Sequence, residues 1–173
     1  MIAEVVTMWA TWLRHPTHGL VALLPQIDPP STTIATVANI YDEVSDSVAA
    51  RLQMPDDSKL PAVCVSTADV VSGWMQVQPF HNRGEVEIAT RYILRDSDTK
   101  SALQACSRVE RALRESRRRF LTVAGSESSR GLHGVAIYEA RDWRFDVFRS
   151  PDDTVATLGV LSTFLCNDPQ PIP

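Results

Sequence analysis

Apolar residues near the start of the chain recur at intervals of three and four, which is the period of an amphipathic helix. The stripe consists of Ile2, Val5, Val6, Trp9, Trp12 and Leu13. His15-Pro16 ends this pattern, because proline disfavours a helical conformation in the residue before it. Thr17 opens a second short helical turn through residues 19–24, and Pro25 is expected to stop it.

Residues 27–60 form a variable excursion for which the pattern leaves two interpretations open. The apolar positions Val37, Tyr41, Val44, Val48 and Leu52 recur at intervals of three and four. That spacing favours a helix over residues 34–52. Alternatively, Ile40-Tyr41 is a short strand that runs into the acidic, serine-containing loop DEVSDS.

Alternation with a period of two predicts the next elements. Residues 61–71 are the first expected strand, and the turn-rich stretch 79–84 separates it from a clearer strand over residues 85–95. One face of the second strand holds Val86, Ile88, Thr90, Tyr92 and Leu94, and the other holds Glu85, Glu87, Arg91 and Arg95. This polar face is expected either to be solvated or to contact a neighbouring subunit.

A long amphipathic helix is predicted from Thr99 to about residue 123, with Asp98 as its N-cap. Its apolar face consists of Ala102, Ala105, Cys106, Val109, Ala112, Leu113 and Phe120, and Arg111, Arg114 and Arg118 lie opposite. A loop over 125–131, strands over 135–140, 143–148 and 155–166, and a flexible tail over 167–173 complete the chain. This order predicts one α+β domain, with a mainly antiparallel or mixed sheet flanked by an N-terminal helix and the long helix.

Motifs that carry chemistry are not found in this sequence. Its three cysteines, Cys64, Cys106 and Cys166, are odd in number and far apart, so buried thiols are expected rather than disulfides or a zinc site. The pair His15 and His18 spans a proline-containing helix end, which does not favour a metal site. The acidic pairs Asp56-Asp57 and Asp152-Asp153 lie in turn-like sequence, where aspartate is common. We therefore predict no enzyme activity, no cofactor and no metal.

Charge is distributed unevenly along the chain. Residues 108–119 contain six arginines and two glutamates, a net of +4, whereas the whole chain carries −4, so the remainder carries −8. Three interpretations stay open: a solvated helix face whose arginines complement the helix dipole, a contact between a basic and an acidic protein surface, or contact with DNA phosphates. No apolar run of 18 residues occurs, so no membrane span is predicted.

The order of these elements resembles the tail terminator (tail completion) proteins of long-tailed bacteriophages. The matching segments are MIAEVVTMWATWL (1–13), NIYD (39–42), LPAVCVS (60–66), GEVEI (84–88), RYIL (91–94), the helix over 98–120 and the closing strands. The resemblance covers nearly the whole chain, although its motifs are an outline more than a signature.

The resemblance implies a protein without catalysis or cofactor that forms a ring, usually of six copies. Such a ring caps the tail tube, contacts the major tail tube protein and the head–tail connector protein, and lets DNA pass through its lumen without specific binding. It implies a location in the neck of the virion tail after synthesis in the bacterial cytoplasm. The candidate subunit-interface residues are Glu85, Glu87, Arg91, Arg95, Arg111, Arg114 and Arg118. The alternatives are another neck or minor tail protein, such as a head–tail connector, and a small soluble ligand-binding domain or enzyme.

Overall fold

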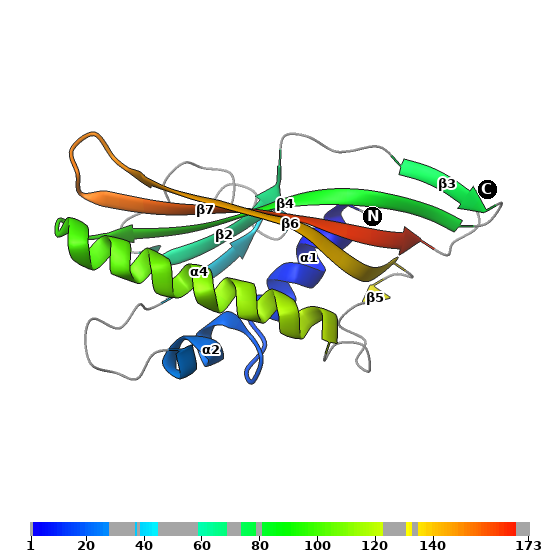
Figure 1. Cartoon of the computed structure of the whole chain (residues 1–173), viewed down its shortest axis with the longest axis horizontal. Helices are drawn as coiled ribbons and strands as arrows, with labels where there is room; N and C mark the ends of the chain where they lie inside the picture. The colour runs from blue at the N-terminus through cyan, green and yellow to red at the C-terminus, as the bar shows by residue number, and fades with distance from the viewer. Residues whose placement is uncertain are drawn as a thin grey trace.

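The computed structural model describes residues 2–27, 37, 39–44, 59–68, 74–78, 81–122, 131–132 and 135–168. Its elements in chain order are α1 (Ile2–Leu13), α2 (Leu20–Ile27), β1 (Asn39–Asp42), β2 (Ala62–Thr67), β3 (Trp74–Gln78), β4 (His81–Arg95), α4 (Thr99–Thr122), β5 (Gly131–Leu132), β6 (Val135–Arg149) and β7 (Val155–Asp168). The α+β class is confirmed, because a mixed sheet is flanked by the N-terminal helix and by the long helix α4 (Figure 1).

The strands form one sheet in the order β1-β2-β4-β7-β6-β5, and β3 forms a hairpin with the first residues of β4. Strands β1 and β2 are parallel, and the other pairings are antiparallel. The last strand, β7, lies between β4 and β6 and pairs with β4 from Asn82↔Asp168 to Arg95↔Val155. The long connection through α4 therefore brings the C-terminal hairpin back against the middle of the sheet.

Helices α1 and α4 cover one face of the sheet, and α2 packs on α4 (Figure 1). The centre of this layer is an aromatic cluster. The ring centroid of Trp9 lies 5.6 Å from that of Phe120 and 5.4 Å from that of Phe164. The indole Nε1 of Trp9 donates to Thr90 Oγ1 at 3.1 Å, so this buried polar group keeps a partner. These contacts join α1 to both α4 and the sheet. None of the helices in the described part of the chain contains an apolar stretch long enough to cross a membrane.

Three of the sequence predictions are confirmed in detail. Asp98 caps α4, because its Oδ2 accepts the Ser101 N–H at 3.0 Å. All the residues predicted for the apolar face of α4 are buried. On β4, the predicted apolar face from Val86 to Leu94 is buried as well, which is the alternation expected of a strand that packs on helices.

Several predictions about element boundaries are wrong. Gly131, predicted as the last residue of the loop 125–131, belongs to β5 and pairs with Ala136. Pro25 lies inside α2 rather than ending it. A proline here costs a single backbone hydrogen bond, and only two helical residues follow it. Residues 81–84, predicted as part of a turn, belong to β4, because they pair with β3 on one side and, from Asn82 onwards, with β7 on the other. Residues 167–168, predicted as flexible tail, belong to β7, where Asn167 pairs with Arg83 and Ala136.

The two open alternatives for residues 34–52 are decided over residues 39–42. They form β1, which pairs in parallel with Ala62–Val65, so the helix prediction is wrong there. The predicted helical positions 48 and 52 lie outside the described residues. The two strands predicted over 135–140 and 143–148 are one strand, β6, whose alternation is interrupted by irregularities between Ile137 and Glu139 and between Arg141 and Trp143.

Candidate functional site

The polar face of β4 points away from the helices. Because successive side chains of a strand alternate, Glu85, Glu87 and Arg91 project to the side opposite α1 and α4, which we call the outer face of the sheet. Arg91 lies opposite Cys64 of β2 and Gly159 of β7, and Arg95 is exposed at the end of β4. The sequence prediction of an apolar and a polar face on this strand is therefore confirmed.

Strand β6 adds arginines to the outer face that the sequence did not single out. The Nη2 atom of Arg144 lies 2.6 Å from Glu87 Oε1, and the Nη1 atom of Arg141 lies 3.8 Å from Glu85 Oε1. Both pairs reach across β7, which separates β4 from β6. Arg141 also pairs with Glu139 at 2.9 Å. The glutamates proposed as interface residues are thus already neutralised within the subunit.

The arginines on α4 are paired along the helix. Arg114 Nη2 lies 2.5 Å from Glu110 Oε1, and Arg118 Nη2 lies 2.7 Å from Glu115 Oε1. Arg119 Nε reaches the same Glu115 oxygen at 2.9 Å. Hydrogen bonds from Arg118 and then Arg119 lower the pKa of Glu115 to about 2. This carboxylate therefore stays charged across the physiological range and holds two arginine side chains in place.

Glu110 is the centre of a junction between α4 and β6 that sequence reasoning missed. It is buried, and its Oε1 accepts the indole N–H of Trp143 at 2.7 Å as well as the Arg114 guanidinium. The guanidinium of Arg117 lies 5.2 Å from the Trp143 ring and donates to the main-chain oxygens of Arg141 at 2.9 Å and Asp142 at 3.0 Å. Burial lowers the pKa of Arg117. These contacts hold β6 against α4 at the irregularity of β6 between Arg141 and Trp143.

A groove of about 760 Å³ lies between α2 and the C-terminal half of α4. Its lining includes Leu23 and Ile27 of α2, together with Glu115 and the five arginines Arg111, Arg114, Arg117, Arg118 and Arg119. Five arginines, less Glu115 and the Glu110 that binds Arg114, give +3. We call this the arginine groove. It lies on the helical side of the sheet, so the structure does not bring the α4 stripe together with the polar face of β4.

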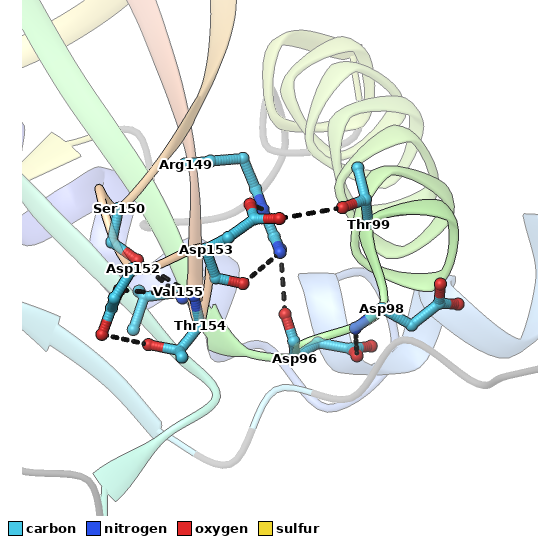
Figure 2. Close-up of polar contacts among 9 residues, drawn as sticks. All are labelled: Asp96, Asp98, Thr99, Arg149, Ser150, Asp152, Asp153, Thr154 and Val155. Atoms are coloured by element: carbon cyan, nitrogen blue, oxygen red, sulfur yellow. Dashed lines mark hydrogen bonds and ion pairs between the residues drawn. The ribbon is translucent and has the colours of Figure 1, made fainter.

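The acidic pair Asp152-Asp153 is part of a turn, as predicted. Figure 2 shows Arg149 between the turn and Asp96, and Thr99 of α4 against Asp153. All four carboxylate oxygens of the pair accept hydrogen bonds, from Ser150 and Thr154 to Asp152 and from Arg149 and Thr99 to Asp153. These hydrogen bonds hold the pKa values of both carboxyls below their usual range. The pair connects the β6–β7 hairpin to the start of α4.

The His15-His18 pair also has a local structural role. The Nδ1 atom of His15 accepts the backbone N–H groups of Thr17 and His18, both at 3.2 Å, so it closes the turn between α1 and α2. Within the described residues, no group of three His, Cys, Asp or Glu side chains is placed to hold a metal ion. The three cysteines are buried and free.

No known protein family matches the sequence, and no curated protein matches it either.

Proposed function

We propose that this chain is a non-enzymatic structural subunit of a phage virion, a tail terminator that forms a ring on the end of the tail tube. The ring would join the tube to the head–tail connector, and the tail tube protein and the connector would be its partners. The sequence resemblance motivates this proposal. The fold supports it through the arrangement of two different surfaces on opposite sides of the sheet.

The observation that carries the proposal is the one-sided helical layer. Within the described residues, α1, α2 and α4 all lie on one side of the sheet, and the other side carries the charged outer face (Figure 1). The arginine groove lies on the helical side. When two unlike surfaces of one subunit meet in head-to-tail contacts, the assembly is heterologous, and it becomes a ring if the rotation closes.

Charge is consistent with a role around DNA that does not involve tight binding. The chain carries a net −4, which gives no general attraction to phosphates. The basic residues are concentrated at the arginine groove, where they suit contact with an acidic protein surface. Accordingly, the groove is our candidate for contact between neighbouring subunits, and the lumen is expected to let DNA pass.

The test is the solution mass over a concentration series, measured by size-exclusion chromatography with light scattering, with negative-stain imaging of any large species. Arg118→Glu should raise the concentration needed for half-assembly by about tenfold, because a reversed charge meets a like charge across the contact. Arg118 is the better target than Arg114, since Arg114 also binds the buried Glu110. Lys100→Glu is the matched control: it makes the same charge change at the other, exposed end of α4.

The two variants separate the possible outcomes. If only Arg118→Glu assembles more weakly than the wild-type protein, the groove is supported as an interface. If both variants assemble equally well, the groove is not part of the interface. A strictly monomeric wild-type protein at every concentration would count against the ring itself. Gene order distinguishes a terminator from another neck protein, because a terminator gene is expected directly before the gene for the tail tube protein.

The arginine groove also favours a second candidate function, the binding of a small polyanion. Guanidinium groups bind phosphates and carboxylates bidentately, and the groove holds five of them. Pyrophosphate and citrate are suitable probes in thermal-shift and calorimetric titrations. Saturable binding that Arg118→Glu weakens and Lys100→Glu does not would favour this function over the ring.

A further inference from the structure

The second long surface that could bind a partner is a sheet edge. In the sheet order, β6 is followed only by β5, which pairs with Val135 and Ala136 alone. From Trp143 to Arg149, β6 has no strand partner on that side among the residues that the structure describes. An open edge of this length presents a row of unpaired backbone groups, which is a template for another strand.

Residues 143–147 are the accessible part of this edge. On one side, the main-chain oxygens of Arg141 and Asp142 already accept hydrogen bonds from Arg117. Further along β6, the backbone N–H of Val147 donates to the Oδ1 atom of its neighbour Asp146 at 2.8 Å and not to another strand. Since backbone groups alternate in direction along a strand, those of Trp143, Phe145 and Val147 point outward. Residues 144, 146 and 148 point toward β7.

The side chains of this segment make it attractive to a partner. Phe145 and Phe148 are exposed to 54% and 58%, respectively, and they are large apolar residues at a sheet edge. Phe145 shares the helical side with its opposite residue Val160, and Phe148 lies on the outer face next to Gly159. Leu103, also exposed, lies two helical turns before Glu110 on the side of α4 that contacts Trp143. Exposed apolar side chains therefore lie on both faces of the sheet beside the open backbone.

We propose that residues 143–147 pair with the same residues of a second copy, antiparallel and about a two-fold axis at Phe145. In this register Arg144 lies opposite Asp146 of the second copy, and Asp146 lies opposite its Arg144, so two ion pairs form on the outer face. On the helical side, Phe145 meets Phe145 and Trp143 meets Val147. The outward backbone groups of the three odd-numbered residues then form about six hydrogen bonds.

Other two-fold registers are excluded by the same residues. An axis at Asp146 would place two carboxylates directly opposite each other, and an axis at Arg144 would do the same with two guanidinium groups. An axis at Trp143 would require the carbonyls that Arg117 occupies. An axis at Val147 would place Asp146 opposite Phe148 and leave its charge without a partner. Only the register at Phe145 satisfies backbone direction, charge and apolar contact together.

This contact would cover the open edge in the free protein, and it does not depend on the proposed role in a phage tail. The self-pairing commits to one arrangement, in which each residue at the axis faces its own copy. That property gives the proposal a direct test, because a residue on a two-fold axis can crosslink to itself.

The experiment compares Phe145→Cys with Phe148→Cys under mild oxidation in mildly alkaline buffer. In the proposed register the two Cα atoms at position 145 are about 5.5 Å apart, within the range for a disulfide. Those at position 148 are about 20 Å apart, because six residues separate Phe148 from its opposite position 142. The native cysteines are buried, and burial raises the pKa of Cys106 to about 11 and of Cys166 to about 12, so they are poor competitors.

Phe145→Cys should form a disulfide-linked dimer at least about tenfold faster than Phe148→Cys, since pairing raises the local thiol concentration. Equal rates, or no dimer from a Phe145→Cys chain with native circular dichroism, would overturn the proposal. In the Phe145→Cys background, Asp146→Arg should slow crosslinking, because the new arginine repels Arg144 of the second copy. Adding Arg144→Glu to that variant should restore the crosslinking rate, because the ion pairs then form with reversed charges. If rings form but position 145 does not crosslink, the edge contact is refuted and the proposed ring is not. If position 145 crosslinks but no rings form, the ring is refuted and the edge contact is not.

Discussion

Replacing Glu110 with alanine should lower the stability of the fold more than the same substitution at Glu115, the other glutamate of α4. Glu110 is buried and accepts hydrogen bonds from Trp143 Nε1 at 2.7 Å and from Arg114. Its removal leaves the indole N–H without its partner, at a cost of about 1.5–3 kcal/mol for a lost hydrogen bond to a charged group. Loss of the buried Cγ methylene adds about 0.8 kcal/mol. Arg114 is 59% exposed and regains water, so its contribution is small.

The expected total is a decrease of about 3 kcal/mol in the free energy of unfolding. Urea unfolding followed by tryptophan fluorescence and by circular dichroism measures it, with the slope against denaturant used to check two-state behaviour. Glu115→Ala is the matched control, because Glu115 lies on the same helix, is 29% exposed and pairs only with exposed or half-buried arginines. It should lower the unfolding free energy by less than about 1 kcal/mol.

Two further variants identify the source of the loss. Glu110→Gln keeps an oxygen acceptor and the side-chain volume, so it should cost only about 1 kcal/mol. A double-mutant cycle with Trp143→Phe should give a coupling energy of about 1–2 kcal/mol between the two positions. If Glu110→Ala costs no more than Glu115→Ala, or if the coupling is near zero, the junction does not stabilise the packing of β6 on α4 and this reasoning is wrong.

Three other predictions concern the capping, the backbone and the charge of the helices. Asp98→Ala should lower the unfolding free energy by about 1 kcal/mol and Asp98→Asn by a few tenths, as measured by urea unfolding, because asparagine can replace the N-cap acceptor. Gly19→Ala should cost about 2 kcal/mol or more in the same assay, since its Cβ would lie 2.4 Å from two carbonyl oxygens at the end of α1. Arg118→Ala should raise the pKa of Glu115 from about 2 toward 4.5 in a carboxyl NMR titration. Because the folded-state pKa is depressed, the stability that it contributes is present above pH 4.5 and lost as the pH falls toward 2, and the variant should flatten this dependence.

The elements that the sequence predicts well are those with long, regular periodicity. Strand β4 alternates over its central residues, and α4 keeps one apolar stripe and a capping aspartate, so local pattern alone specifies their burial. The failures occur where tertiary pairing outweighs local signals. Residues 81–84 contain turn-forming Asn82 and Gly84, yet β3 and β7 bind them on both sides. Pro25 signals a helix end, but here it removes a single backbone hydrogen bond and only two helical residues follow it.

The candidate site is harder to predict than the fold. The pair between Arg144 and Glu87 depends on β7 lying between β6 and β4, and the sequence does not reveal this strand order. Glu110 is different, because a signal for it exists. It lies four residues after Cys106 and three before Leu113, both on the apolar face of α4. An acidic residue at that position predicts a buried partner, although the partner itself, Trp143, is identified only by the fold.

The two proposed contacts of this subunit depend on different interactions, charge at the arginine groove and backbone pairing at the β6 edge. Of the candidate charges, Glu87 on β4 and Arg118 on α4 are engaged in ion pairs within the subunit, and partly exposed pairs of this kind contribute only about 0–1 kcal/mol each. Charge at the arginine groove is therefore expected to select and orient a partner, whereas backbone pairing at β6 would depend less on charge. Salt distinguishes them, because screening weakens contacts between exposed charges. Raising the ionic strength should lower assembly through the groove, while the crosslinking rate of Phe145→Cys should change little. A similar loss of both would mean that the edge contact is held mainly by its Arg144–Asp146 pairs rather than by its backbone.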